Sequence, residues 1–361
     1  MRRQLHKALI AAVLVMTLLL PPFHVSAQEI TEPTIEATQA TQPTVAAETV
    51  PETVPTETAP TEPESAAPVI HSPDPTSAIY QICDALAQNM EARHLFVYHT
   101  STGKVLYSKT VGNGKLFPAS ITKLFSTYVA LQYLDPDEVI TAGDELDLVH
   151  EGSSIAFIPK GSQLRIKTIV EGMMLPSGND AAMVLAAAAG RVIAQDAALA
   201  PADAVAVFVD EMNRQAELLG FEKSHFSNPD GWHTGSHYTC LNDLARIAHL
   251  VLENDTIRRY MRLSKDETSF VSGHLVVWEN TNLLLNREEG YYRSDAIGMK
   301  TGYTRPAGYS LMSAFTFDEG EIVIGLFGYT AKNARFWDAI QLVKAVKTQL
   351  RLEMQSDESV G

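Results

Sequence analysis

The stretch AIGMKTGYTRPAGYSLMSAFTFDEGEIVIGLFGYT, residues 296–330, contains three apolar runs separated by two short turns. Arg305 and Pro306 fall in the first turn, and the residues DEGE at 318–321 form the second. Runs rich in aromatic and β-branched residues that are bounded by glycine, proline and acidic residues are typical of antiparallel strands. The stretch therefore predicts three consecutive strands of one sheet.

The other strands of this sheet are predicted near the start of the folded region. HLFVYHT at 94–100 and KVLYSKT at 104–110 have the pattern of two strands, SAIYQICDALAQNM at 77–90 has helical spacing, and residues 117–260 are mostly helical in pattern. A final amphipathic helix carries its apolar residues on one face: Phe336, Ile340, Val343 and Leu350. This order indicates an α+β fold with an antiparallel sheet of about five strands, covered by the N- and C-terminal helices and interrupted by a mostly helical insert.

The N-terminus has the features of an export signal. Basic residues precede the apolar run 8–20, and small residues follow at Ser26 and Ala27. The run is short for a membrane span, so a signal peptide over residues 1–27, cleaved after Ala27, is favoured over a retained anchor. Either alternative places the protein outside the cytoplasm, in the cell wall, at the outer face of the plasma membrane or secreted, with membrane contact at most through an uncleaved N-terminal segment.

Three further divisions follow from composition. Residues 28–75 are rich in Thr, Pro and Glu, contain no Lys or Arg, and predict a disordered acidic linker. Residues 76–353 are predicted to form the catalytic domain, and residues 354–361 a flexible tail. The chain has a formal charge of −15, but much of it lies in the linker, so no basic surface for nucleic acid is expected.

The sequence predicts neither a disulfide framework nor a metal centre. Cys83 and Cys240 are the only cysteines, which leaves two free or buried thiols, or one bridge. His233 and His237, in HTGSH, have metal-like spacing but no H-E-x-x-H motif and no nearby Cys or carboxylate cluster. A loop with two solvated histidines is the favoured interpretation, and a metallo-carboxypeptidase is the alternative.

Catalytic chemistry is first indicated by PASITK, residues 118–123. In a helix that begins near Pro118, Ser120 and Lys123 lie one turn apart on the same face. Burial and the positive potential of the helix N-terminus both disfavour a proton on Lys123. A lysine that is partly neutral is a suitable general base, and this predicts an activated nucleophile at Ser120.

Two other motifs raise the specificity of this signal. MMLPSGNDAA contains Ser177 and Asn179 ahead of a helix, and GMKTGYT contains Lys300, Thr301 and Gly302 on a predicted strand. Taken alone, Ser177 to Asn179 form a common type of helix N-cap. Gly302, a glycine within a strand, marks close approach of another backbone, such as that of a substrate. In the order S-x-x-K, S-x-N, K-T-G they form the motif set of penicillin-recognising serine enzymes.

With its neighbouring segments FSNPDGWHTGSHYTCLNDLARIA, NTNLLL and GMKTGYTRPAGYSLMSA, the chain resembles the D-alanyl-D-alanine carboxypeptidases, the low-molecular-mass penicillin-binding proteins. The resemblance runs from about Ser77 to Leu352 and implies a β-lactamase/transpeptidase-like fold. It also implies a substrate, peptidoglycan stem peptides ending in D-Ala-D-Ala, and covalent inhibition by β-lactams. It implies no cofactor and no metal.

The resemblance assigns a role to each motif residue. Ser120 is the nucleophile that forms an acyl-enzyme, Lys123 takes its proton, and Ser177 passes a proton to the leaving amine. Three further residues act on these groups or on the substrate: Asn179 holds Lys123 and the substrate amide, Lys300 adds positive charge, and Thr301 binds the terminal carboxylate. The backbone N–H groups of Ser120 and Tyr303 form the oxyanion hole. Gly302 and Tyr303 lie where the substrate adds as a strand at the sheet edge. Several relatives have histidine where this chain has Tyr303.

Other activities use the same motifs and remain open. A D,D-endopeptidase or transpeptidase uses the same acyl-enzyme. A β-lactamase needs fast deacylation, for which WENTN offers Glu279 and Asn282, but this segment is interpreted as part of the connection between strands. A non-hydrolysing receptor for β-lactams or wall peptides is a further alternative. Arg293 and Arg305 flank the Lys300 strand and are candidates for binding the carboxylate, although a solvated surface position is favoured for both.

Overall fold

The computed structural model describes residues 68–318 and 320–358. The predicted signal peptide 1–27, most of the predicted linker 28–75 and the last residues of the predicted tail lie outside the described residues. Residues 68–75 are described, and they pack along the domain: the backbone N–H of His71 donates to Gly103 O (2.9 Å), and the N–H of Val105 donates to His71 O (2.9 Å). Residues 68–75 therefore contact the folded domain, although the sequence places them in the linker.

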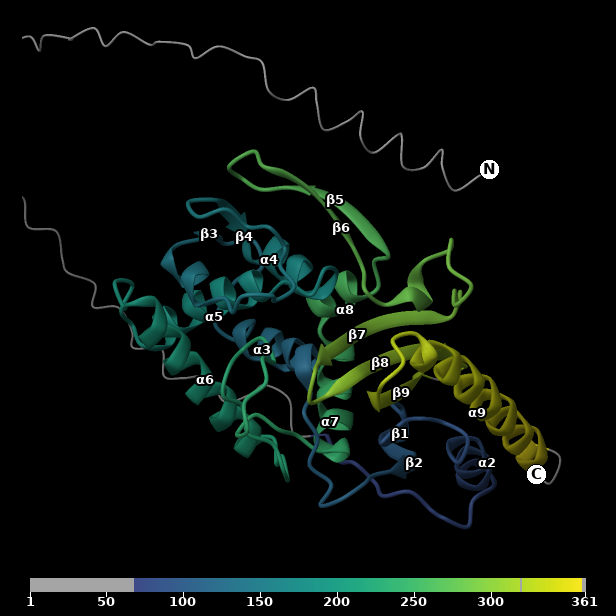
Figure 1. Ribbon diagram of the computed structural model, residues 1–361. Helices are drawn as coiled ribbons and strands as arrows, with labels where there is room; N and C mark the ends of the chain where they lie inside the picture. The colour runs from purple at the N-terminus through teal and green to yellow at the C-terminus, as the bar shows by residue number, and fades with distance from the viewer. Residues whose placement is uncertain (1–67, 319, 359–361) are drawn as a thin grey trace, which may run out of the picture. The chain divides into compact units, whose positions relative to one another are not determined.

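A five-stranded antiparallel sheet is the centre of the domain, in the order β2-β1-β9-β8-β7 (Figure 1). Its strands are β1 (His94–His99), β2 (Lys104–Lys109), β7 (Ala296–Thr304), β8 (Gly308–Phe317) and β9 (Gly320–Tyr329). The two early strands and three late strands are those that the sequence predicts. Pairing of β1 with β9 closes the sheet across the helical insert, and β7 is left at one edge.

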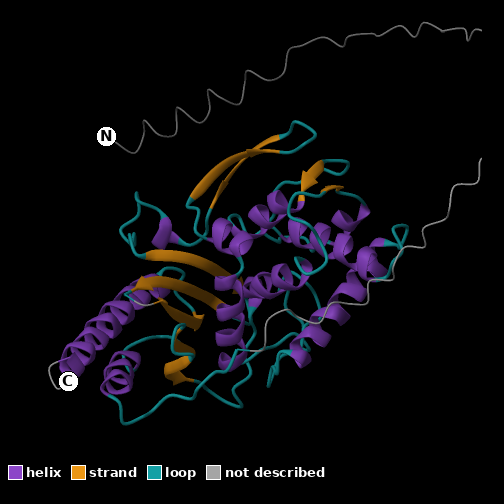
Figure 2. Ribbon diagram, turned by 180° about the vertical axis from the view of Figure 1, so that it is seen from behind, coloured by secondary structure: helices purple, strands orange, loops and turns teal. Residues whose placement is uncertain are grey.

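Helices cover both faces of the sheet, as Figure 2 shows from behind. One face packs against α2 (Ala78–Ala87) and α9 (Ala334–Glu358), where Leu95 and Val97 contribute to a hydrophobic core. Phe96 and Tyr98 point to the opposite face and join the core of the insert. Because successive side chains of a strand alternate between faces, a strand that is covered on both sides is apolar throughout.

The insert carries six helices, as its sequence pattern predicts, and two small hairpins, which it does not. The helices are α3 (Thr122–Ala130), α4 (Ile166–Met174), α5 (Asn179–Ile193), α6 (Pro201–Leu218), α7 (Leu241–Glu253) and α8 (Asp255–Met261). The hairpins pair β3 (Val139–Thr141) with β4 (Gln163–Arg165), and β5 (Lys265–Ser269) with β6 (Leu275–Glu279). These strands are short and half-exposed, so their apolar pattern is too weak to separate them from loops.

Helix α9 is longer than predicted. It continues through Glu358, into the segment predicted as a tail from residue 354. Its predicted apolar face packs on the sheet, with Phe336 and Val343 fully buried. Among the described residues, no helix has both the length and the apolar character needed to cross a bilayer.

Candidate active site

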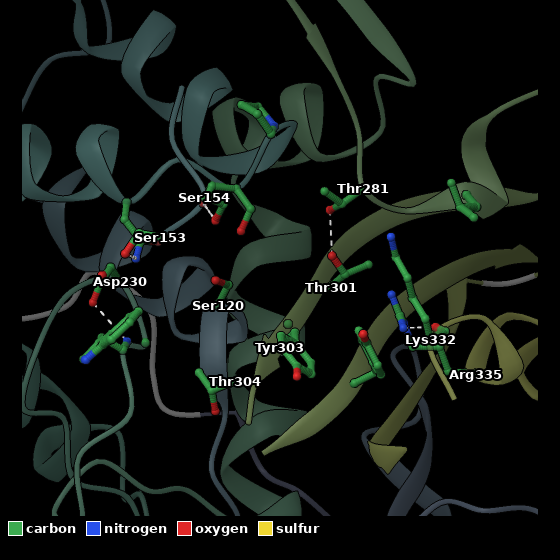
Figure 3. A pocket seen from close by; sticks show the side chains of 18 of the residues that line it. Ser120, Ser153, Ser154, Asp230, Thr281, Thr301, Tyr303, Thr304, Lys332 and Arg335 are labelled. Carbon is green, nitrogen blue, oxygen red and sulfur yellow. Dashed lines mark hydrogen bonds between the residues drawn. The ribbon is translucent and has the colours of Figure 1, made fainter. Parts of the chain in front are cut away.

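A cleft of about 750 Å³ lies between the helical insert and strand β7 (Figure 3). Six of the eight predicted site residues line it: Ser120, Ser177, Asn179, Thr301, Gly302 and Tyr303. The other two are the lysines, which are buried behind its surface, since Lys123 is 0% exposed and Lys300 is 1% exposed. Each lysine hydrogen-bonds to a lining residue, so the structure brings all eight together.

The nucleophile lies in a tight turn, η1 (Ala119–Ile121), that leads directly into α3. Lys123 Nζ donates a hydrogen bond to Ser120 Oγ at 3.0 Å, which confirms the predicted contact. The first turn is a 3₁₀ turn rather than an α-helical one, and Ala119 has φ of +50°. In 3₁₀ geometry side chains three residues apart eclipse one another, which brings the hydroxyl and the amine together.

Lys123 has two further acceptors in the same wall. Its Nζ donates to Asn179 Oδ1 at 2.7 Å and to the backbone carbonyl of Asp230 at 2.8 Å. Burial lowers the pKa of Lys123 to about 8, and the negative charges of Asp230 and Asp180 oppose part of this shift. The amine is therefore fixed in place, and a usable fraction of it is unprotonated near neutral pH.

The second motif is positioned by a loop that precedes it. Ser177 adopts a left-handed conformation, with φ of +67°, and its carbonyl accepts a hydrogen bond from Ser154 Oγ at 2.8 Å. Asn179 begins helix α5 and donates from Nδ2 to Ser153 Oγ at 3.0 Å. Because Ser153 accepts from the amide nitrogen, the amide oxygen of Asn179 faces Lys123.

The opposite wall is strand β7, which is at the sheet edge where the sequence predicts substrate addition. Thr301 Oγ1 shares a hydrogen bond of 2.6 Å with Thr281 Oγ1. A Cβ at Gly302 would lie 3.1 Å from Pro118 O and 3.3 Å from the backbone N of Ser120. The sequence predicts that a backbone approaches this glycine closely, but the backbone is that of the chain's own nucleophile turn and not only a substrate.

Lys300 is held differently from Lys123. Its Nζ donates to the carbonyl of Thr301 at 3.2 Å. Its pKa lies well below the usual range because of burial first, and then because of the positive charges of Lys123 and Arg335. Among the residues that the structure describes, no carboxylate pairs with Lys300 or Arg335 in this wall.

Arg335, at the start of α9, is the most prominent lining residue that sequence reasoning misses. It is 4% exposed, its Nε has no hydrogen-bond partner within the described residues, and its Nη1 donates to the carbonyl of Lys332. Its guanidinium lies 5.2 Å from the centroid of the Tyr309 ring, and burial lowers its pKa to about 10. No sequence motif marks this arginine. It comes shortly after the last strand, at a position that could equally be the exposed face of an amphipathic helix.

The arginines weighed from sequence lie elsewhere. Arg293 pairs with Asp295 at 2.8 Å, and Arg305 is exposed; neither lines the cleft. Tyr303 is 52% exposed, and its ring stacks on Tyr309 with centroids 4.3 Å apart.

The sequence interpretation of one histidine is wrong, and a glutamate that the sequence already disfavours as a base lies outside the cleft. His237 is not solvated: it is 1% exposed, its Nδ1 accepts the N–H of Ser227, and its Nε2 hydrogen-bonds to Thr122 Oγ1 at 2.8 Å. Burial lowers its pKa to about 3, so it is a neutral support for helix α3. Glu279 is 71% exposed and pairs with Lys265 on the β5–β6 hairpin, which removes it as a deacylation base.

Metal and disulfide chemistry find no support in the described part of the chain. Within residues 68–318 and 320–358, no group of three or more His, Cys, Asp or Glu side chains is placed to hold a metal ion. Cys83 and Cys240 are both free and buried, and burial raises the pKa of each thiol to about 12.

With this geometry in place, comparison with known proteins identifies the family. The family model described as D-alanyl-D-alanine carboxypeptidase matches residues 82–328. The chain belongs to this family. The predicted family and the β-lactamase/transpeptidase-like fold are both confirmed.

Individual relatives support the same assignment. The D-alanyl-D-alanine carboxypeptidase of Streptomyces sp. (strain K15) is 30% identical over 69% of this chain and 84% of its own length. DacF of Bacillus subtilis is 27% identical and DacA of Escherichia coli 26%, over 68% and 66% of this chain. The alignments span only 59% of DacF and 56% of DacA.

Solved structures agree with the fold. The Streptomyces K15 DD-transpeptidase superposes with a TM-score of 0.63 at 29% identity, covering 72% of this chain and 97% of that one. DacD from Francisella tularensis, a D-alanyl-D-alanine carboxypeptidase, gives a TM-score of 0.59 at 24% identity, over 71% and 70% of the two chains, which concerns the fold alone.

Proposed function

We propose that this chain is a serine-type D-Ala-D-Ala carboxypeptidase that removes the terminal D-alanine from peptidoglycan stem peptides. Family membership supports the reaction class. The observation that carries the proposal is the buried amine of Lys123, which lies 3.0 Å from Ser120 Oγ and is fixed by Asn179. A hydroxyl paired with a partly neutral amine at the surface of a cleft is an activated nucleophile.

Acylation follows from this pairing. Lys123 takes the proton of Ser120 as Oγ attacks the carbonyl between the two D-alanines, and a C–O bond replaces the C–N bond. Ser177 relays the proton to the departing amine. Asn179 keeps Lys123 oriented, and the backbone N–H groups of Ser120 and Tyr303 stabilise the oxyanion, where loss of one donor costs about 3 kcal/mol.

Recognition of the terminal carboxylate belongs to the sheet wall. Lys300 and Arg335 are buried basic side chains without a carboxylate partner among the described residues, and Thr301 adds a hydroxyl at the cleft surface. An incoming carboxylate would compensate the charge of Arg335 and favour the protonated form of Lys300, since a hydrogen bond to a charged group is stronger than one between neutral groups. Gly302 lets strand β7 approach the nucleophile, so a substrate strand added at this edge lies over Ser120.

The same site should react with β-lactams, whose strained amide presents an equivalent carbonyl and carboxylate. Export by a signal peptide over residues 1–27 would bring the enzyme to its peptidoglycan substrate, with the acidic linker 28–75 as a tether.

Intact-mass measurement after incubation with penicillin tests this function. The parent protein should gain one penicilloyl adduct, and Ser120→Ala should gain none. Release of D-alanine from a peptide ending in D-Ala-D-Ala should be lost in the same variant. If the parent protein neither forms the adduct nor releases D-alanine, the proposed carboxypeptidase function is wrong.

Transpeptidation is a second candidate. The K15 relative is described as a carboxypeptidase in one comparison and as a DD-transpeptidase in the other. Both reactions pass through the same acyl-enzyme and differ in whether water or an amine attacks it. Adding a glycine-peptide amine to the D-alanine assay separates them, because a transpeptidase converts the donor into a new, longer peptide.

A further inference from the structure

The segment NTNLLL, residues 280–285, contributes none of the three motifs, yet its threonine lines the cleft. Thr281 is exposed and lies on the connection between strands β6 and β7. Its Oγ1 is 2.6 Å from Oγ1 of Thr301, and Figure 3 shows the two hydroxyls facing each other. No other group within the described residues hydrogen-bonds to either hydroxyl. The two threonines therefore form an isolated pair on the wall that recognises the carboxylate.

Two buried asparagines hold Thr281 in this position. Asn280 is 8% exposed, its Nδ2 donates to Leu263 O at 2.9 Å, and its Oδ1 accepts the backbone N–H of Asn282 at 2.9 Å. Asn282 is 1% exposed, and its Oδ1 accepts the N–H of Leu284 at 3.2 Å. The peptide is thus fixed on both sides of Thr281, so this hydroxyl is a rigid part of the cleft surface.

Each hydroxyl of the pair carries one proton, so only one of the two can donate across the 2.6 Å gap. A carboxylate accepts hydrogen bonds and donates none. Thr301 therefore donates to a carboxylate only when its own proton turns away from Thr281. In that arrangement Thr281 supplies the proton between the two oxygens, and Thr301 Oγ1 accepts one bond while it donates another. Hydrogen bonds arranged in such a chain strengthen one another.

We propose that Thr281 is a positioning residue for carboxylate recognition, an inference that rests on the proposed function. Thr281 donates its hydroxyl proton to Thr301 Oγ1 and thereby directs the Thr301 proton towards the terminal carboxylate of the bound peptide. Without this partner the Thr301 hydroxyl rotates, and it must lose that freedom each time a substrate binds. Because Thr281 acts through Thr301, its effect should disappear when Thr301 has no hydroxyl.

This role is separable from support of the fold, because Thr281 is exposed and the neighbouring asparagines provide the bracing. Valine has the branched shape of threonine without the hydroxyl, so Thr281→Val removes the hydrogen bond and little else. Thr281→Ser loses only a methyl group and retains the donor. Thr268→Val makes the same change on strand β5, at a residue outside the cleft lining, and is the matched control.

A double-mutant cycle tests the coupling in four proteins: the parent, Thr281→Val, Thr301→Val and the double variant. The measured quantities are kcat/KM for release of D-alanine from a peptide ending in D-Ala-D-Ala, and the second-order rate constant for acylation by a fluorescent penicillin, which carries an equivalent carboxylate. Thr281→Val should lower both by about threefold to tenfold, as expected for one hydrogen bond between neutral groups. Thr301→Val should lower them further, and the double variant should match Thr301→Val within about twofold.

The remaining variants separate positioning from structural support. Thr281→Ser and Thr268→Val should both stay within about twofold of the parent. Thr281→Val should lose less activity towards the same peptide with a terminal amide than towards the acid, because the charged acceptor is absent. Its thermal unfolding midpoint should stay close to that of the parent.

Three results would overturn the role of Thr281 while the parent still forms the adduct and releases D-alanine, and these leave the proposed function standing. The first is a loss below about twofold in Thr281→Val. The second is a loss of the same size in the parent and in the Thr301→Val background, which is the signature of an effect that does not pass through Thr301. The third is failure of Thr281→Ser to restore the rate. A parent that forms no adduct and releases no D-alanine overturns the proposed function, and this role with it.

Discussion

The two walls of the cleft hold their cations in opposite ways. In the helical wall, Lys123 donates to three acceptors, the oxygens of Ser120, Asn179 and Asp230. In the sheet wall, Lys300 donates to one carbonyl, and Arg335 has an unpartnered Nε among the described residues. An amine with three acceptors is oriented for proton transfer, whereas buried basic groups with unused donors favour binding of an anion. The difference assigns chemistry to the insert and carboxylate recognition to the sheet.

The strongest test of this comparison is Lys123→Met. Removal of the amine should slow acylation by penicillin and by a D-Ala-D-Ala peptide equally, by on the order of a thousandfold or more, because no other base contacts Ser120 Oγ in the described structure. Acylation rates from stopped-flow or gel-based labelling measure this directly. Acylation within tenfold of the parent rate would mean that the helical wall does not supply the base.

The pH dependence of acylation should follow Lys123. Because only the neutral amine accepts the Ser120 proton and its pKa is about 8, the acylation rate should rise about tenfold between pH 6 and pH 7 and level off above pH 8. Initial acylation rates at subsaturating penicillin measure this profile. A profile that is flat between pH 6 and pH 8 would contradict the assignment.

Substitution of Arg335 by Gln should have a smaller and more selective effect. Loss of a charge-assisted hydrogen bond of about 1.5 to 2 kcal/mol raises KM for a peptide with a free terminal carboxylate by roughly tenfold to thirtyfold. The same peptide with a terminal amide lacks the charge and should show little further loss. Equal loss for both peptides would indicate that Arg335 supports the fold and does not bind the carboxylate.

The smallest predicted effect tests whether the helical wall itself changes with pH. Glu171, in α4, is 2% exposed, and burial followed by its hydrogen bond with Asp266 raises its pKa to about 8. In the unfolded chain Glu171 loses its proton near its ordinary pKa of 4.5, whereas in the folded state it keeps the proton up to about pH 8. The free energy of unfolding is therefore greatest below pH 4.5 and falls as the pH rises towards 8. Glu171→Gln should flatten this decline of the unfolding midpoint between pH 5 and pH 8, by a few degrees, while the acylation profile keeps its shape. If Glu171→Gln instead changed the pH profile of acylation, that profile would depend on Glu171 in the helical wall and not on Lys123 alone.

Much of the site could be predicted because its signals are local. Ser120 and Lys123 are three residues apart in one turn, and their contact needs only helical geometry. The strand pattern of 296–330 similarly predicts the three late strands, because period and turn residues are short-range features. The roles assigned to Ser177, Asn179 and Tyr303 come from the motif set, and they stay predictions until variants are measured.

The residues that were missed lack any local signal. Arg335 lies on a helix whose exposed positions also carry basic residues, and only the fold places it over the Tyr309 ring and in the lining of the cleft. Asp230 and Gly231 read as an ordinary turn, and His237 reads as a loop histidine. Their importance comes from contact with the α3 region, more than a hundred residues earlier in the chain.

The sequence by itself determined the elements and the chemical groups of this protein: the five strands, the helical insert, and a serine, lysines and amide in three motifs. Helix period, strand alternation and turn residues depend on only a few neighbouring positions, so they can be recognised from the sequence alone. Only the tertiary structure decided that the buried Lys123 amine has three acceptors, whereas the buried Arg335 guanidinium keeps an unpartnered Nε among the described residues. Burial, desolvation and hydrogen-bond satisfaction depend on neighbours brought together by the whole fold, and no single stretch of the chain contains them.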